Sequence, residues 1–219
     1  LIQMASAKRA PPVVYNGEFP ASLNSALQKM NVPEGDEGRV EGSAFIHSNE
    51  KCDSTITMDP IINDGVARFE VVFNGHEGEE FSLGIVKASQ VFKKDDLPIG
   101  NANNGSNSIR YQNSGNLSHR ICYGSNNSTP VKGNSPFNCG QKISIEADMK
   151  SNPRKAVFFI DGVEQKNSVV NIPEAVRFYV FVSKSGSSFQ VTRFERLPSS
   201  SARGVPGSKQ WEWGNDWKQ

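Results

Sequence analysis

The sequence predicts an all-β fold, an antiparallel two-sheet β-sandwich or a barrel, with one short N-terminal helix and an extended C-terminal tail. Two patterns support this prediction. Short runs rich in β-branched and aromatic residues recur with turn-forming residues between them, which is typical of antiparallel sandwiches and barrels. Helical periodicity occurs in one stretch only. With 219 residues, 36% of them hydrophobic, the chain can fill the core of one large domain.

The helix is expected at residues 22–30, SLNSALQKM, where apolar residues recur at helical spacing and Ser22 can cap the first turn. Asn31 and Pro33 end it, because proline and the residue before it disfavour the helical conformation. A helix this short does not hold alone in water, so it must pack on another element. Residues 1–20 are expected to be an extended lead-in.

Eight strands are expected after this helix. In the run at 142–149, apolar residues alternate with polar ones, so one face of that strand should be buried. In the last run, strict alternation places Phe189, Val191 and Arg193 on one face and Phe194 on the opposite face. The eight runs are 66–73, 81–88, 108–112, 119–124, 142–149, 155–162, 176–183 and 188–195.

A hairpin is expected at Asp161-Gly162, between two runs of strand character. A two-residue type I′ turn requires positive φ at both central positions, which Asp tolerates and Gly adopts freely. Asp161 could instead be a catalytic acid, but its setting favours the corner of a hairpin.

Two long irregular stretches, residues 89–107 and 124–141, are dense in Asn, Gly and Ser. Loops of this length inside a compact domain are usually functional or mobile, so a solvated connection and a recognition rim are both open interpretations. In a recognition rim, Asn amides would donate and accept hydrogen bonds while a nearby Arg or Tyr anchors the partner. Tyr111 is expected in the core. The partner-binding residues expected near these loops are Asn103, Asn104, Arg110, Asn126, Asn127 and Lys132.

The C-terminal tail contains all three tryptophans of the chain, Trp211, Trp213 and Trp217. The preceding residues, 198–209, have the Ser, Gly and Pro content of a linker. An aromatic tail on a tether either docks on another protein or folds back as a strap on its own domain. Both alternatives are open, and we count the three tryptophans among the expected partner-binding residues.

Six segments, taken in order, resemble the SPRY domain family over about residues 43–196. Gly84 stands at the glycine of the family's Ile-Gly-Val strand, and Asp161 stands where that family commonly has Asn before Gly. The six segments are RFEVVF (68–73), FSLGIV (81–86), SIRYQNSG (108–115), CGQKISIEADM (139–149), VFFIDGVEQ (157–165) and VRFYVFVSKSGSSFQVTRFE (176–195).

The resemblance implies two curved antiparallel sheets packed face to face and a non-enzymatic protein that recognises a peptide or protein through loops at one edge. It divides the chain into an N-terminal extension (1–42), the sandwich (43–197) and a linker with the tryptophan tail (198–219). The chain departs from the family pattern where Phe69 replaces a core tryptophan and where Gln141 replaces an aspartate. No binding residue of the family can be carried over one by one.

Composition argues against several classes of protein. The 24 Lys and Arg residues nearly balance the 23 Asp and Glu residues, and a net charge of +1 does not favour a nucleic-acid binder that relies on bulk charge. No apolar run approaches the roughly 20 residues that span a bilayer. The residues after Leu1 do not form a secretory signal, and a start without Met suggests a processed product or part of a longer protein. Widely spaced cysteines favour free thiols and an intracellular location, cytoplasmic or cytoskeletal; they are Cys52, Cys122 and Cys139.

No catalytic residue, metal site or cofactor is expected. The stretch HEGEE at 76–80 lacks the second histidine of a zinc-protease motif. The sequence also has no G-x-S-x-G nucleophile elbow. The adjacent acids Glu79-Glu80 and Asp95-Asp96 are expected to be solvated, the alternative being a glycosidase pair set across a cleft.

These features predict a non-catalytic protein-interaction module, an adaptor or scaffold that forms a subunit or domain of a larger assembly. It would bind a protein or peptide partner through its edge loops and its tryptophan tail. The alternative is a carbohydrate-binding, lectin-like sandwich whose Asn-rich loops bind sugar hydroxyls. A hydrolase is the third class, but the sequence contains no recognisable nucleophile, base or set of metal ligands to support it.

Overall fold

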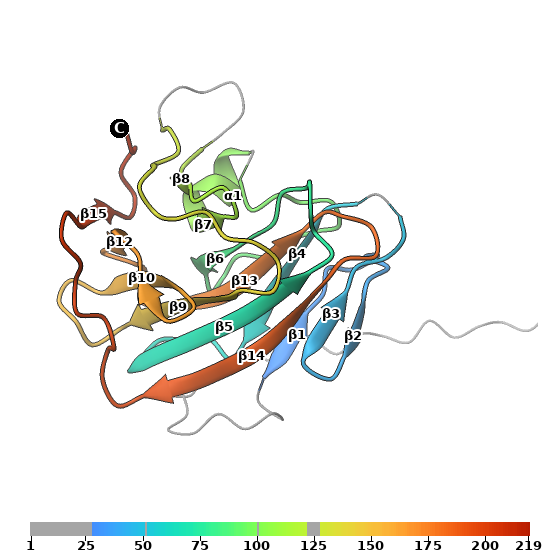
Figure 1. The fold of residues 1–219 in the computed structure, drawn as a ribbon, viewed down its shortest axis with the longest axis horizontal. Helices are drawn as coiled ribbons and strands as arrows, with labels where there is room; N and C mark the ends of the chain where they lie inside the picture. The colour runs from blue at the N-terminus through green and yellow to red at the C-terminus, as the bar shows by residue number, and fades with distance from the viewer. Residues whose placement is uncertain (1–27, 51, 100, 122–127) are drawn as a thin grey trace, which may run out of the picture.

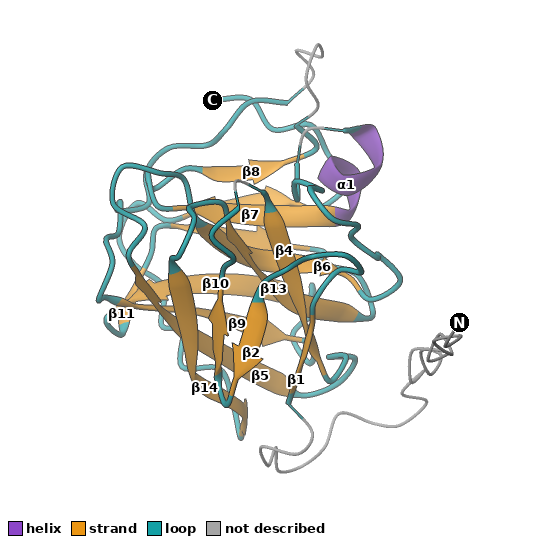
Figure 2. Ribbon diagram, turned by 90° about the vertical axis from the view of Figure 1, so that its right-hand side faces the viewer, coloured by secondary structure: helices purple, strands orange, loops and turns teal. Residues whose placement is uncertain are grey.

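The computed structural model describes residues 28–50, 52–99, 101–121 and 128–219. Two curved β-sheets pack face to face, and one short helix of the described chain lies beside an edge of the smaller sheet (Figures 1 and 2). The predicted all-β sandwich is therefore confirmed.

The smaller sheet has six strands in the order β1-β4-β13-β6-β7-β8, and every neighbouring pair is antiparallel. Its central strands are rich in β-branched and aromatic residues, which suits a sheet whose inner face is fully buried. The bounds are β1 Lys29–Asn31, β4 Ser54–Asp59, β6 Ser82–Lys87, β7 Ser108–Gln112, β8 Leu117–His119 and β13 Val176–Val182.

The larger sheet has nine strands in the order β15-β12-β10-β9-β5-β14-β3-β2, with β11 paired to the end of β10. Its strand pairs are antiparallel except for β12 and β15, which run parallel at one edge. The bounds are β2 Arg39–Glu41, β3 Ala44–Ile46, β5 Val66–Asn74, β9 Lys142–Asp148, β10 Lys155–Ile160, β11 Val163–Glu164, β12 Asn167–Val170, β14 Ser188–Leu197 and β15 Lys209–Glu212.

The core between the sheets is built on stacked phenylalanines. Phe69 of β5 stacks on Phe178 of β13, with ring centroids 5.1 Å apart, and meets the edge of Phe194 at 5.6 Å. All three rings are buried, so Phe69 lies at the centre of the core. Tyr111 is also fully buried, as expected, and its hydroxyl donates to the carbonyl of Ser135 (2.7 Å).

The alternation predicted for β14 is wrong beyond Val191. A β-bulge shifts the register between Val191 and Arg193, where β14 carries one extra residue. The alternation of buried and exposed side chains therefore changes phase at this point. As a result Phe189, Val191 and Phe194 all point into the core, while Arg193 is exposed.

The hairpin at Asp161-Gly162 is confirmed. The φ angles are 49° at Asp161 and 81° at Gly162, and Ile160 pairs with Val163 across the turn. The Asp161 carboxylate accepts a hydrogen bond from the backbone N–H of Lys142 (2.9 Å) and another from the side chain of Gln141 (2.8 Å). Asp161 therefore fixes the corner of the hairpin, and Gln141 supplies one of its partners.

The N-terminal helix is not shown. Residues 22–27 lie outside the described residues, and the end of the predicted helix is instead strand β1, where Lys29 pairs with Asp59 of β4. The edge of the six-stranded sheet offers this segment backbone partners and a place for Met30 against the core, which a short isolated helix lacks. The strand predicted at 119–124 is wrong at residues 120 and 121, because the chain turns out of β8 after His119 with a positive φ (55°) at Arg120. Residues 122–124 of that prediction lie outside the described residues.

One short helix was not expected from the sequence. Helix α1 (Ala102–Asn107) lies within the first Asn-rich stretch and packs beside β7 (Figure 2). Asn101 caps it, because its side-chain oxygen accepts from the backbone N–H of Asn104 (2.8 Å).

The outer face of the nine-stranded sheet is covered by the start of the predicted linker. Arg68 and Glu146 form an ion pair there (3.3 Å), with the guanidinium carbon of Arg68 4.7 Å from the centroid of the Phe159 ring. The Ser201 backbone N–H and the Ser200 hydroxyl each donate to the Glu146 carboxylate at 3.0 Å. Glu146 is fully buried, so these bonds hold the linker on the sheet.

Candidate functional site

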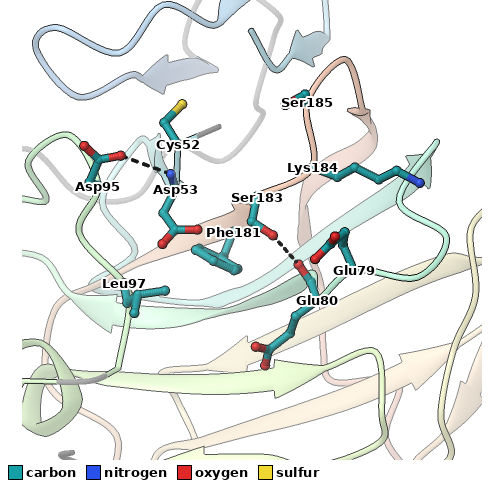
Figure 3. A pocket seen from close by; sticks show the side chains of 10 residues that line it. All are labelled: Cys52, Asp53, Glu79, Glu80, Asp95, Leu97, Phe181, Ser183, Lys184 and Ser185. Atoms are coloured by element: carbon teal, nitrogen blue, oxygen red, sulfur yellow. Dashed lines mark hydrogen bonds between the residues drawn. The ribbon is translucent and has the colours of Figure 1, made fainter. Parts of the chain in front are cut away.

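An open cavity of about 750 Å³ lies on the outer face of the six-stranded sheet where several loops meet (Figure 3). Its walls come from the loop before β4, the β5–β6 loop, the stretch between β6 and α1, and the β13–β14 loop. We call this the loop-end pocket. Its ten lining residues are Cys52, Asp53, Glu79, Glu80, Asp95, Leu97, Phe181, Ser183, Lys184 and Ser185.

The floor of the loop-end pocket is an aromatic ring backed by a buried cation. Phe181 of β13 is 2% exposed, and the guanidinium carbon of Arg110 lies 4.6 Å from its ring centroid. Arg110 is itself 2% exposed; its Nε donates to the Ser82 hydroxyl (2.8 Å), and its Nη2 lies 3.1 Å from a Glu80 oxygen. Arg110 therefore lies under the pocket and positions Phe181 and Glu80.

Half of the ten residues that line the loop-end pocket are charged. Four of them are acidic and one is Lys184, whose ammonium donates to the Glu77 carbonyl (2.6 Å). Asp95 accepts a hydrogen bond from the Asp53 backbone N–H (3.2 Å), which brings the two carboxyls together. Burial raises the pKa of the Asp53 carboxyl, and the neighbouring Asp95 carboxylate raises it further. The pocket is therefore electronegative.

The acidic pocket does not have the arrangement of a metal site. Across the described parts of the chain, no group of three or more His, Cys, Asp or Glu side chains is placed to hold a metal ion. The described cysteines Cys52 and Cys139 are free thiols. No helix in the described ranges is long and apolar enough to cross a membrane.

Two of the predicted contact residues, Asn103 and Asn104, support the pocket wall instead of lining it. Asn104 is 3% exposed; its amide donates to the Leu97 carbonyl (2.9 Å) and accepts from Gln90 (3.0 Å). Asn103 donates to Gln90 (3.2 Å) and accepts from Asn107 (3.2 Å). This amide network holds the stretch that carries Asp95 and Leu97 against the sheet.

The remaining predicted residues lie elsewhere or are not described. Asn126 and Asn127 lie outside the described residues. Lys132 is exposed, and its backbone N–H and carbonyl bond the side chain of Gln219 (2.6 and 3.1 Å), so it lies beside the C-terminal tail.

The tryptophan tail packs on its own domain, the second of the two alternatives left open by the sequence. Strand β15 lies beside β12 (Figure 1). Trp217 is 2% exposed and belongs to the hydrophobic core, and Trp211 and Trp213 pack against that core while partly exposed. The structure therefore brings the three tryptophans together with Lys132, away from the residues of the loop-end pocket.

Sequence reasoning missed most of the pocket residues. Glu79, Glu80 and Asp95 were expected to be ordinary solvated acids, and Asp53, Phe181 and Lys184 carried no signal. The only hint in the sequence is the presence of adjacent acids in two separate loops. Their meeting depends on the path of the stretch between β6 and α1, which folds back across the sheet.

Comparison with known proteins supports the fold. No protein-family model matches the sequence, and no curated protein matches it. Among solved structures, the SPRY domain of human HERC1 is similar at a TM-score of 0.53 and 14% identity, with 81% of this chain and 99% of that chain covered. The PSpry domain of TRIM65 is similar at a TM-score of 0.53 and 11% identity, with 75% and 92% covered.

These similarities and the two-sheet sandwich show the fold of the chain. The chain has a SPRY-type fold, as the resemblance of its sequence segments implied.

Proposed function

We propose that this chain is a non-catalytic protein-interaction module whose loop-end pocket binds a segment of a protein partner. The observation that carries the proposal is the open pocket built by several loops at one end of the sandwich. Its volume of about 750 Å³ falls in the range of sites that hold a ligand group, roughly 300–1,000 Å³. SPRY domains as a class are interaction modules, which agrees with this assignment.

The lining of the pocket indicates the chemistry of the partner. Four carboxylates outnumber the two cations Lys184 and Arg110, so a Lys or Arg side chain of the partner would be attracted. The half-buried side chain of Leu97 offers an apolar surface for the stem of such a side chain. The proposed ligand is therefore an extended peptide that inserts one basic side chain.

An adaptor or scaffold role in a larger assembly is part of the same proposal, as is an intracellular location. The free thiols of Cys52 and Cys139 suit a reducing compartment. The carbohydrate-binding alternative has less support, because the amides of Asn103 and Asn104 already bond within the loop and are not free for sugar hydroxyls.

Selection from a displayed library of random peptides, with the full chain as bait, tests the proposal. We expect the selected peptides to share a Lys or Arg. Glu79→Gln and Asp95→Asn each remove one negative charge from the pocket while keeping the side-chain shape, so each should weaken binding about 5- to 10-fold. Binding should also weaken as salt rises.

Glu174→Gln is the matched control. Glu174 is exposed and precedes β13, whereas the pocket lies at the other end of that strand, so binding should not change. Selected peptides without a basic residue, or equal binding by the pocket variants and the control, would contradict the proposed site.

A further inference from the structure

The C-terminal segment, residues 209–219, binds its own domain in the manner of a peptide ligand. β15 adds to the free edge of β12 as a parallel strand. Backbone bonds extend this pairing at both ends: the Lys209 N–H donates to the Lys166 carbonyl and the Trp213 N–H to the Val170 carbonyl, each at 2.9 Å. Strand addition to a sheet edge is a recurring mode of peptide recognition.

Two tryptophans anchor the segment beyond the strand pairing. The Trp217 backbone N–H donates to the Ser128 hydroxyl (3.0 Å), and its carbonyl accepts from the Thr129 N–H (2.8 Å). The Trp211 indole N–H donates to the side-chain oxygen of Asn167 (3.0 Å). Buried aromatic anchors with satisfied N–H groups are the features that dominate binding energy in protein interfaces.

A buried histidine completes the receptor. His119 is fully buried, and its Nδ1 lies 2.8 Å from the Ser108 carbonyl, which can only accept, so Nδ1 carries the proton. Nε2 is then free to accept the Gly214 N–H at 2.9 Å. The rings of Trp213 and Trp217 lie 4.8 and 5.2 Å from the imidazole centroid. His119 therefore presents a fixed acceptor to the backbone of the segment.

The tether, residues 203–208, joins the segment to the sandwich and takes little part in these contacts. Arg203, Gly204 and residues 206–208 are exposed, and the Glu164 carboxylate holds the tether by accepting from the backbone N–H groups of Arg203 (2.7 Å) and Gly204 (3.0 Å). The strand pairing, the indole bonds and the histidine contact all involve residue 209 or later. Any copy of the segment that reaches the groove can make them.

We propose that the tail groove, formed by the edge of β12, His119 and residues 128–132, is a peptide-binding groove that also takes the C-terminal segment of a second copy of this chain. Such an exchange keeps every contact of the segment and changes only which chain supplies it, which makes domain swapping a low-cost route to a dimer. In dilute solution the covalent tether favours the segment of the same chain, because linking raises its effective concentration to about the millimolar range.

The first test uses the full chain with a protease recognition sequence added between Gly204 and Val205 and cut after folding. The cut chain keeps its own segment without a tether. A fluorescent peptide of sequence KQWEWGNDWKQ should then exchange into the groove, whereas the uncut chain should bind it about 100-fold more weakly. The same peptide with Trp217→Ala should bind the cut chain roughly 30-fold more weakly. Failure of the cut chain to exchange its segment for the labelled peptide would overturn the proposal.

The second test addresses the second copy. The same full chain is refolded at high concentration, and its mass is measured by light scattering before and after cutting. A swapped dimer should form and then fall to monomer mass when both tethers are cut, because each sandwich keeps the partner's segment as a separate peptide. A chain that stays monomeric, or a dimer that survives the cut, would contradict exchange between copies.

Discussion

The loop-end pocket and the tail groove are two binding-type surfaces of opposite character. The pocket is open, and half of its lining residues are charged, of which Glu79 and Asp95 are exposed. The groove is filled by the chain's own C-terminal segment, and Trp217 within it is 2% exposed. Water solvates the charges of the loop-end pocket. The apolar and hydrogen-bonding groups of the tail groove instead contact the chain's own C-terminal segment.

The groove is buried and therefore contributes to folding, whereas the pocket is open to solvent. Burial of large aromatic groups stabilises the folded chain, so changes in the groove should lower stability. Exposed carboxylates contribute little to stability, so changes in the pocket should affect binding alone. The predictions below run from the largest expected effect on the free energy of unfolding to the smallest.

Trp217→Ala should have the largest effect. It leaves a cavity in the core and removes an indole N–H that donates to the Glu212 carbonyl (2.8 Å), so we expect a loss of about 4 kcal/mol in urea unfolding. Trp213→Ala is the control, because Trp213 is only partly buried and should cost clearly less. Equal losses would break the distinction between an anchored and a peripheral tryptophan.

Glu146→Gln should have the next largest effect. The change leaves the buried guanidinium of Arg68 without its counter-charge and weakens the bonds to Ser200 and Ser201 that lead toward the tail. We expect a loss of about 3 kcal/mol in urea unfolding. Glu195→Gln is a suitable control, because its ion pair with Arg193 is exposed and should be worth less than about 1 kcal/mol.

Stability should fall as the pH is lowered from about 6.5 toward 4. Burial lowers the pKa of both His119 and His76 from 6.5 to about 4, so between these values the unfolded chain binds protons that the folded chain does not. Each histidine should lower the free energy of unfolding by up to about 1.4 kcal/mol per pH unit. Urea unfolding at pH 7, 6 and 5 would measure this dependence of stability on pH.

His119→Gln should remove about half of that slope, because His76 is then the remaining one of the two histidines whose pKa is lowered by burial. All three tryptophans lie in the C-terminal segment, so their fluorescence reports on unfolding of the tail groove. Circular dichroism reports separately on unfolding of the two sheets. A slope that is the same in wild type and variant would show that His119 is not held neutral in the folded chain.

Glu79→Gln and Asp95→Asn should have the smallest effect, within about 0.5 kcal/mol of wild type in urea unfolding. Both residues are exposed, and Asn at position 95 keeps an acceptor for the Asp53 N–H and tolerates the positive φ of 62° there. A loss above about 2 kcal/mol for either would mean that the pocket acids are structural.

The sequence predicted the fold well where local patterns decide it. Strands with strong β-branched and aromatic content and the Asp161-Gly162 turn depend on neighbours a few residues apart. The helix predicted from the spacing at 22–30 is wrong at its C-terminal end, because Lys29–Asn31 pairs with the edge of a distant strand, β4. The bulge in β14 also depends on a partner strand, so alternation alone misplaced Phe194.

The candidate site was much harder to predict. Arg110, Asn103 and Asn104 were expected to contact a partner, yet their hydrogen-bonding groups meet Ser82, Gln90 and other residues far apart in the sequence. Sequence composition shows that an amide is present in a loop but does not show whether it is already bonded. The loop-end pocket arises only when loops from four parts of the chain fold together.

Hydrogen exchange of the full chain, with and without a selected basic peptide, shows whether the loop-end pocket is the recognition site. We expect added protection at residues 79–81, 95–97 and 181–185, which line or adjoin the loop-end pocket, with no change in the C-terminal segment. A version of the peptide with its basic residue changed to Gln should give little protection. Protection confined to residues 128–132 and 209–219, or none at the pocket, would contradict the claim that the open surface is the recognition site.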